Sequence, residues 1–161
     1  MGTQHIERRD LPGYRTAVVR GRLPVAELGA FVGRAIAAVA DALNSQGISP
    51  AGPPFARFHR HSPGDFDVEV GFPTPRDFSP AGDVQPSALP GGPAAVMVYV
   101  GPYDEMEPAY GALAGWIAQH GEQPVGDPWE IYFSDPTQEP EPQKWRTEIV
   151  MPLRTSLPTN T

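Results

Sequence analysis

Apolar residues recur at helical spacing in two segments of the chain. In residues 24–47 they form one stripe opposite the charged positions: Val25, Leu28, Val32, Ala35, Ile36, Val39 and Leu43. Spacings of three and four residues are typical of a helix with one buried face. A second stripe occurs in residues 104–121, with Met106, Ala109, Tyr110, Leu113, Ile117 and His120. The sequence therefore predicts two amphipathic helices, with Gly47 and Gly121 placed to end them.

Runs rich in β-branched and aromatic residues flank both helices. One run precedes each helix and two follow it, so predicted strands occupy residues 14–21, 53–61, 66–73, 94–101, 128–135 and 145–152. The order strand, helix, strand, strand therefore occurs twice. Val18 and Val98 are 80 residues apart, and Pro73 and Pro152 are 79 apart. A nearly constant offset of this kind indicates an internal duplication.

This repeat predicts the fold class and the domain organisation. We expect a single α+β domain over residues 1–161, built from duplicated βαββ units at about residues 12–73 and 94–153. Each unit should form an antiparallel sheet with one helix on one face, and the helix-free faces of the two sheets should enclose a central cleft. Residues 74–93 are dense in proline and glycine, so we expect a surface linker there rather than a packed element.

The net negative charge is concentrated in the second half of the chain. Residues 1–93 hold nine acidic and nine basic residues, whereas residues 94–161 hold ten acidic and three basic residues, which accounts for the net charge of −7. Such a field repels the phosphate backbone of nucleic acids and attracts cations, so we expect no direct nucleic-acid binding. A solvated acidic surface that only aids solubility would have the same composition.

Composition also excludes several classes of site. The chain has no cysteine, which rules out disulfides, thiolate metal sites and a cysteine nucleophile. It has no apolar run long enough to span a membrane and no signal-peptide core near its N-terminus. We therefore expect a soluble, cytoplasmic protein that does not act in a membrane.

The run WEIYFSD, residues 129–135, places an acid and a phenol within an apolar strand. Side chains alternate between the two faces of a strand, so Glu130 and Tyr132 point one way while Trp129 and Ile131 point the other. Because a helix needs an apolar sheet face to pack on, we expect Trp129 and Ile131 to face the helix. Glu130 and Tyr132 should then face the cleft.

Neighbouring strands add further candidates to the face of Glu130. If the last two strands form a hairpin, we expect Glu148 on the same face as Glu130 and Tyr132. Alignment of the two halves, with Pro54 matched to Pro128, places Ala56 beside Glu130 and Phe58 beside Tyr132, so that apolar and aromatic surface faces the acids across the cleft. An acid among aromatic side chains is unfavourable without a partner, and an incoming cation would supply one.

Other interpretations of these residues stay open. Glu130 could instead lie solvated on an outer sheet face, or pair with Arg57 or Arg146, since structural ion pairs also place acids beside aromatic residues. His59 and His61 lie two residues apart on a strand, but no further ligand at a diagnostic spacing accompanies them. We therefore expect no metal site and no cofactor.

The run VYVGPYDEMEPAYGALAGWIAQHG, followed by PWEIYFSDP and KWRTEIVMPL, resembles the GyrI-like small-molecule-binding family. Members of this family also serve as effector-binding domains of multidrug-sensing AraC-type and MerR-type regulators. The resemblance extends to PPFARFH and FDVEVGFP, so it covers nearly the whole chain. It implies a duplicated βαββ architecture with a central cleft, in which a strand acid and the aromatic side chains around it bind bulky, flat, lipophilic cations.

The resemblance also implies a set of ligand-binding positions. Glu130 is similar to the family's ligand-facing acid, and Tyr132 to its neighbouring cleft residue. Glu148 resembles a second acid that some members place on the last strand. Phe58 resembles the aromatic residue of the facing half, and Tyr14 is a weaker match near the first strand. Phe58 stands where the family often has tyrosine, so that wall of the cleft lacks a hydroxyl group.

Three functions are consistent with the resemblance. The first, which we rank highest, is a free-standing protein that takes lipophilic, cationic or toxic compounds into the cleft for sensing, sequestration or detoxification. The second is a hydrolase that opens cyclopropane-containing toxins with water, where Glu130 orients or deprotonates the water and Tyr132 assists. The third is inhibition of a topoisomerase through an outer surface. Because the chain starts at the first strand, we expect no attached DNA-binding region; a homodimer stays open.

Overall fold

The structure is a computed structural model that describes residues 5–60, 65–102, 105–134 and 139–154. Within these ranges the chain forms eight strands, two α-helices and one short 3-10 helix. Their order is β1 (His5–Leu11), β2 (Tyr14–Pro24), α1 (Val25–Ser45), β3 (Phe55–Arg60), β4 (Asp65–Pro73), β5 (Gln85–Leu89), β6 (Gly92–Val100), α2 (Glu107–Gln119), β7 (Trp129–Tyr132), η2 (Pro142–Lys144) and β8 (Arg146–Pro152). Neither helix in this part of the chain combines the length and the apolar character that crossing a membrane requires.

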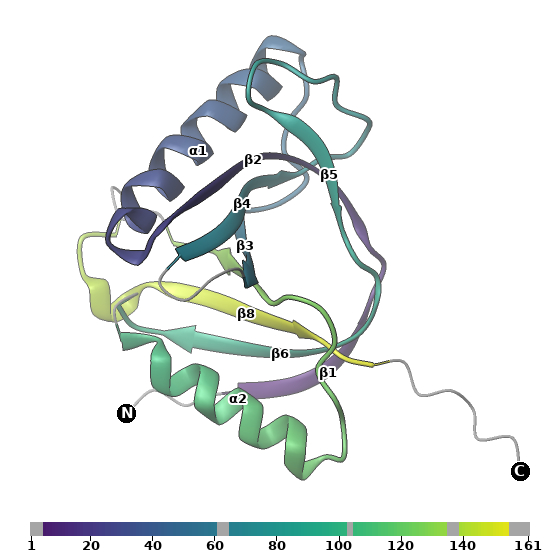
Figure 1. Cartoon of the computed structure of the whole chain (residues 1–161), viewed down its shortest axis with the longest axis vertical. Coiled ribbons are helices and arrows are strands. Elements are labelled where there is room, and N and C mark those ends of the chain that lie inside the picture. Colours follow the sequence, from purple (N-terminus) through teal and green to yellow (C-terminus); the bar gives the residue numbers. More distant parts are fainter. Residues whose placement is uncertain (1–4, 61–64, 103–104, 135–138, 155–161) are drawn as a thin grey trace, which may run out of the picture.

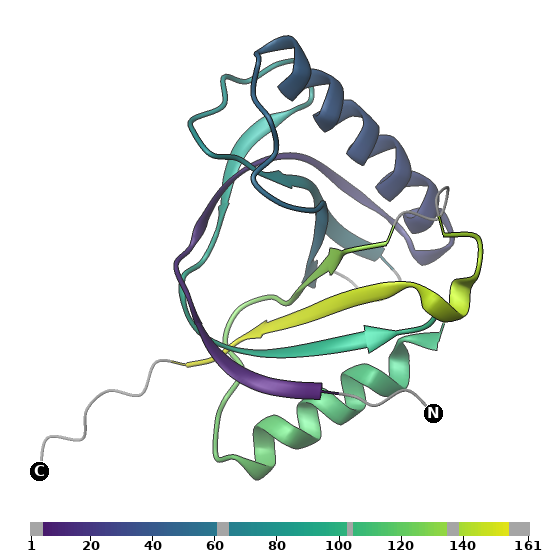
Figure 2. The ribbon, with the colours of Figure 1, turned by 180° about the vertical axis from the view of Figure 1, so that it is seen from behind.

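The eight described strands form a single antiparallel sheet. Their order across it is β1-β6-β8-β7-β3-β4-β2-β5. The sheet curls strongly into a half-barrel, with α1 at one end and α2 at the other (Figure 1). Seen from behind, the chain from β1 into β2 follows one continuous curve from the α2 end to the α1 end (Figure 2). The predicted α+β class is therefore confirmed.

The central pairing joins the two repeats into one sheet. β3 pairs with β7 through Phe55↔Ile131, Ala56↔Glu130 and Arg57↔Trp129. The expectation of two separate sheets is not met, because β3 and β7 would each have left an unpaired edge of backbone N–H and C=O groups. Pairing them satisfies both edges and brings the strands that follow the two helices into direct contact.

The order of elements repeats as the sequence predicted. β2-α1-β3-β4 is followed by β6-α2-β7-β8, and both helices end before a glycine with positive φ, Gly47 at 68° and Gly121 at 68°. β1 and β5 extend this pattern. β5 lies in the predicted linker and pairs with β2. Leu89 in this strand and Val84 just before it are buried, so this part of the linker is packed and the expectation of a surface path is not met.

Both helices pack on the same face of the curled sheet. One row of directly paired residues crosses six strands on this face: Met97, Ile149, Glu130, Ala56, Val70 and Val19. α2 covers the end with Met97 and Ile149, and α1 covers the end with Ala56 and Val70. We call this the helix face. Glu130 is the acidic residue in the row and lies at its middle, between the two helices.

The opposite face lines the inside of the half-barrel, and we call it the inner face. Its core contains Val18, Phe55, Leu89, Ala94, Val96, Trp129 and Val150, with Leu11 and Ile131 packed beside them. The expectation that Trp129 and Ile131 face the helices is therefore wrong. Curling gives the sheet a second apolar core, and the largest apolar side chains of β7 fill that core instead.

Candidate functional site

Glu130 is a buried acid on the central strand of the helix face. Only 9% of its surface is exposed, and its direct neighbours across the sheet are Ala56 on β3 and Ile149 on β8. A carboxylate among apolar side chains loses the solvation it has in water. The alternative that Glu130 lies solvated on an outer face is thus wrong, and its local partners decide its chemistry.

Two tyrosine hydroxyls satisfy the Glu130 carboxylate. Tyr132, two residues further along β7, donates a hydrogen bond to Oε1 at 2.8 Å. Tyr110, on the first half of α2, donates to Oε2. The acid therefore receives one donor from its own strand and one from the helix that packs over the second repeat. Phenol donors are neutral, so they leave the negative charge uncompensated.

Burial controls the protonation of this cluster. Loss of solvent raises the pKa of Glu130 above its ordinary value, while the hydrogen bonds from Tyr110 and Tyr132 oppose part of that rise. Burial also raises the pKa of Tyr110, and the adjacent Glu130 charge raises it further. Tyr110 consequently keeps its proton near neutral pH and remains a donor, whereas Glu130 keeps its proton to a higher pH than an exposed glutamate does.

Nearby arginines have other partners. Within the described residues, no Lys, Arg or His nitrogen lies within 4.0 Å of the Glu130 carboxylate. Arg57 donates to the Asp127 carbonyl at 3.3 Å and lies 5.6 Å from the Trp129 ring centre. Arg146 lies over the Phe133 ring at 5.1 Å. The alternative pairing of Glu130 with Arg57 or Arg146 is therefore wrong.

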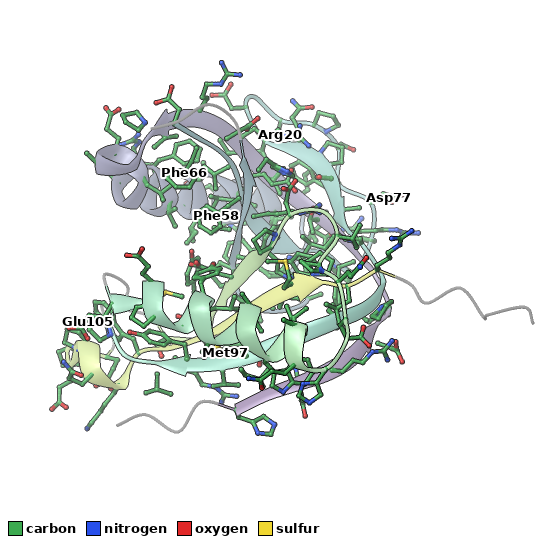
Figure 3. All side chains as sticks on the ribbon, turned by 60° about the horizontal axis from the view of Figure 1, so that its bottom comes forward. Arg20, Phe58, Phe66, Asp77, Met97 and Glu105 are labelled. Atoms are coloured by element: carbon green, nitrogen blue, oxygen red, sulfur yellow. The ribbon has the colours of Figure 1, made fainter. Side chains whose placement is uncertain are left out.

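Aromatic side chains extend the helix face beside Glu130. Phe58 on β3 packs in the same apolar cluster as Tyr132, and its ring meets that of Phe66 edge to face at a centroid distance of 6.2 Å. Figure 3 shows Phe58 and Phe66 in the region between α1 and α2. Phe66 is 36% exposed, so part of its ring can be reached from solvent.

A small cavity runs along α2 next to the Tyr110–Glu130 contact. Its volume is about 140 Å³, and it is lined by Tyr110, Leu113, Ala114, Ile117 and Ala118 of α2, by Glu122 and Pro124 of the following loop, and by Met151 of β8. Ligand pockets for drug-sized molecules usually measure about 300–1,000 Å³. The cavity as it stands suits a slender molecule.

The predicted site residues divide between the two sheet faces. Glu130, Tyr132 and Phe58 share one face of the sheet, as predicted, but it is the helix face. The expectation that Glu130 and Tyr132 lie on a helix-free face lining a central cleft is therefore wrong, because Trp129 and Ile131 fill the core of the inner face. Glu148 pairs with Ile131 rather than with Glu130, so the prediction that it shares their face is wrong. It lies instead 3.4 Å from Arg9. The register of the β7–β8 hairpin pairs Glu130 with Ile149, so Ile149 lies on the helix face and its neighbour Glu148 points to the other face.

Strand direction and strand register place the remaining predicted residues. β3 and β7 run antiparallel, and the Phe58 N–H donates to the carbonyl of Pro128, the residue before β7 begins. Phe58 therefore does not lie opposite Tyr132, which is where the alignment of the two halves had placed it. Tyr14 begins β2, pairs with Leu89 and is 40% exposed. Its position two residues before Thr16 and four before Val18 places it on the inner face, away from Glu130.

Sequence reasoning missed Tyr110 and Phe66. Tyr110 belongs to the apolar stripe of the second helix and was expected to fill core space, because a stripe shows which face is buried but not which strand it meets. Phe66 opens a predicted strand without any sign of its neighbour. The presence of a polar atom on the Tyr110 ring is the signal that could have identified it, since a buried phenol needs a hydrogen-bond partner.

The three histidines in the described residues each have different neighbours, with His5 beside Glu7. His59 Nδ1 lies 2.7 Å from Asp127 Oδ2, whereas His120 stacks on Trp116 at a centroid distance of 4.0 Å. His61 lies outside the described residues. In the ranges that the structure covers, no three His, Asp or Glu side chains are arranged to hold a metal ion.

Comparison with solved structures identifies the same fold in several proteins. The C-terminal domain of EcmrR superposes with a TM-score of 0.82 at 19% identity, over 95% of this chain and 99% of that domain. The same values hold for EcmrR in its DNA complex, of which this chain spans 58%. A hydrolase from Listeria innocua gives a TM-score of 0.63 at 16% identity, over 92% and 91% of the two chains.

SAV2435, in a structure with bound tetraphenylphosphonium, gives a TM-score of 0.61 at 12% identity, over 93% of this chain and 94% of that one. Identities this low establish the shared fold only. Comparison with functionally curated sequences gives no match. At the level of the family, residues 4–154 match the GyrI-like small molecule binding domain. Because this match spans almost the whole sequence, the chain belongs to the GyrI-like family of small-molecule-binding domains.

Proposed function

We propose that this protein binds lipophilic cations at Glu130, between α1 and α2. The observation that carries the proposal is a buried carboxylate whose described partners, Tyr110 and Tyr132, are neutral donors. A buried negative charge without a cationic partner is unfavourable, so a cation that reaches it gains a strong, poorly screened attraction.

The surroundings of Glu130 select for an apolar cation rather than a metal ion or a hydrated ammonium. Ala56, Ile149 and Phe58 offer no oxygen ligands from their side chains. The Phe58 and Phe66 rings add apolar contact and favourable cation–π attraction. The bound state of a fold relative, SAV2435 with tetraphenylphosphonium, supports this ligand class by analogy.

Binding should release a proton. Burial raises the pKa of Glu130, so part of the free protein carries a neutral acid at mildly acidic pH. A cation favours the ionised form and lowers this pKa on binding. Affinity should therefore rise with pH through the raised pKa of Glu130 and fall as the acid is protonated.

The test is isothermal titration calorimetry with two cations of different shape, the bulky tetraphenylphosphonium and the slender decyltrimethylammonium. At least one should bind the wild type, and Glu130→Gln should weaken that binding about tenfold or more, or about 1.4 kcal/mol. Asp83→Asn is the control, because it removes an equal charge from an exposed turn before β5. Failure of both cations to bind, or equal binding by Glu130→Gln, contradicts the proposal.

A second function uses the same cluster for hydrolysis. Burial raises the pKa of Glu130, which makes its carboxylate a stronger base than that of an exposed glutamate, and Tyr132 donates to the same carboxylate at 2.8 Å, so its hydroxyl is close enough to assist. In a cyclopropane-containing electrophile, the water oxygen would bond to a ring carbon while Glu130 takes one water proton. The bond between that carbon and its ring neighbour would break, and Glu130 would return the proton to the displaced carbon. Mass spectrometry after incubation distinguishes the functions, since only hydrolysis adds the mass of water.

A further inference from the structure

Glu122 lies at the far end of the α2 cavity from the Tyr110–Glu130 contact. The cavity lining begins at Tyr110 on α2 and ends at Glu122, just beyond the helix C-terminus. Eight residues separate Tyr110 from Ala118 along this wall, which is about 12 Å at the helical rise of 1.5 Å per residue. The hollow therefore has the Glu122 carboxylate at one end and the Tyr110 side chain at the other, and the hydroxyl of Tyr110 separates the hollow from the Glu130 carboxylate behind it.

The wall between these two acids is apolar. Leu113, Ala114, Ile117, Ala118 and Met151 offer only hydrocarbon or thioether atoms from their side chains. Placing a charge midway along this wall would cost its solvation without a partner. A charge at one end would meet the Glu122 carboxylate directly, and a charge at the other end would reach Glu130 by displacing the Tyr110 hydroxyl. With Tyr110 displaced, the hollow suits a ligand that is apolar in the middle and cationic at both ends.

Glu122 is only loosely engaged in the described structure. Its Oε1 lies 3.7 Å from Nε of Arg8, a distance that suits a weak ion pair rather than a direct hydrogen bond. The Glu122 side chain is 20% exposed and that of Arg8 is 41% exposed, so Arg8 can turn to solvent when another cation arrives. Glu122 is therefore available to a ligand at a modest cost.

We propose that the α2 cavity, with Glu122 at one end and Glu130 behind Tyr110 at the other, binds slender aliphatic dications whose two cationic groups are separated by an apolar chain of about 12 Å. This inference rests on the proposed function, because Glu130 must first act as a cation site. It adds a second anchoring residue and a ligand shape. A volume of about 140 Å³ accommodates an alkyl chain more readily than a set of aromatic rings.

The decisive comparison pairs decamethonium, which carries a trimethylammonium group at each end of a decane chain, with decyltrimethylammonium, which carries one. On hydrophobic grounds alone the monocation should bind more tightly, because its free end is apolar. With Glu122 as a second anchor, the order reverses, and decamethonium should bind about fivefold more tightly, equivalent to about 1 kcal/mol for a partly exposed ion pair. Hexamethonium, with a shorter chain, should lose this advantage.

Variants assign the effect to each end of the cavity. Glu122→Gln should weaken decamethonium about fivefold and leave decyltrimethylammonium unchanged, whereas Glu130→Gln should weaken both. Arg8→Ala should strengthen decamethonium alone, because it removes the competing partner of Glu122. Ala118→Leu, which keeps helix propensity and fills the cavity, should weaken both cations.

The outcomes separate this inference from the proposed function. If decyltrimethylammonium binds through Glu130 but decamethonium binds no more tightly, or if Glu122→Gln leaves decamethonium unaffected, the second anchor is refuted and the cation site at Glu130 stands. If neither these two cations nor tetraphenylphosphonium binds the wild type, both proposals fail. Circular dichroism of each variant checks that the fold is retained before its affinity is compared.

Discussion

Tyr110 on α2 donates its phenolic hydrogen bond to Oε2 of Glu130 on β7. This contact ties the helix of the second repeat to the strand at the centre of the sheet. It also leaves the acid with a donor that a ligand can replace, because Tyr132 holds the other carboxylate oxygen. The charge state of Glu130 and the position of α2 are therefore coupled through one hydroxyl group.

Stability should fall as pH rises through the pKa of Glu130. Burial raises this pKa above 4.5, so the folded protein binds more protons than the unfolded chain between the unfolded and the folded pKa values. The stabilising contribution is fully present below the unfolded pKa and is lost as pH rises through the folded pKa. The measurement is the unfolding free energy of wild type and Glu130→Gln in urea from pH 4 to 8. Wild type should lose stability relative to Glu130→Gln with increasing pH, and a constant difference would refute this assignment.

Tyr110→Phe should shift the pH dependence of cation binding. Removing one of two hydrogen bonds to the ionised form raises the pKa of Glu130 further, so half-maximal affinity should occur at a higher pH. The variant should also lose about 1–3 kcal/mol of stability at neutral pH, where a charged acceptor loses its donor. Tyr14→Phe, which removes a hydroxyl from the inner face, should change neither quantity. An unchanged pH midpoint in Tyr110→Phe would show that this hydroxyl does not control the acid.

Glu148→Gln should leave cation binding at Glu130 within about twofold of wild type, because its side chain lies on the inner face near Arg9 and Arg146. Loss of the Arg9 pair, at 3.4 Å, should reduce the unfolding free energy by about 1 kcal/mol or less. Calorimetric titration and urea unfolding of the same sample measure both effects. A tenfold loss of affinity would instead place the ligand on the inner face.

Gly71→Ala should destabilise the sheet strongly. A Cβ at this position would lie 1.8 Å from the Ala17 carbonyl oxygen and 2.9 Å from Cα of Val18, both backbone atoms of the paired strand β2. Backbone atoms cannot rotate away, so a loss of about 3 kcal/mol or more is expected. The matched control is Gly33→Ala on an exposed part of α1, where nothing lies within 4 Å and alanine should add about 1 kcal/mol. Equal stability of the two variants in urea unfolding would contradict the close approach.

Local patterns in the sequence identified most of the elements. The apolar stripes predicted α1 and α2, and the alternation in WEIYFSD placed Glu130 and Tyr132 together on one strand face. A helical stripe depends on residues within about two helical turns of each other, and strand alternation depends on residues about two positions apart. They are fixed by the spacing of side chains on a helix or strand, whatever the rest of the fold does.

Register and packing partners required the tertiary structure. The pairing Ile131↔Glu148 placed Glu148 on the opposite face of the sheet from Glu130, because a shift of one residue turns a strand side chain to the other face. For the same reason the sequence did not identify Tyr110 as a hydrogen-bond partner of Glu130. The apolar stripe of its helix shows which face is buried but not which strand that face packs against.

The sequence by itself determined that an acid and a phenol share a face of a strand in an α+β chain, in which the order strand, helix, strand, strand occurs twice. The tertiary structure alone decided that this face lies under the helices, that β3 and β7 join the repeats into one sheet, and that Tyr110 completes the cluster. The physical reason is that the periodicity of side chains is a local property of a helix or strand. Strand pairing and burial depend instead on contacts between segments far apart in the chain, and the favoured arrangement leaves the fewest backbone groups unpaired.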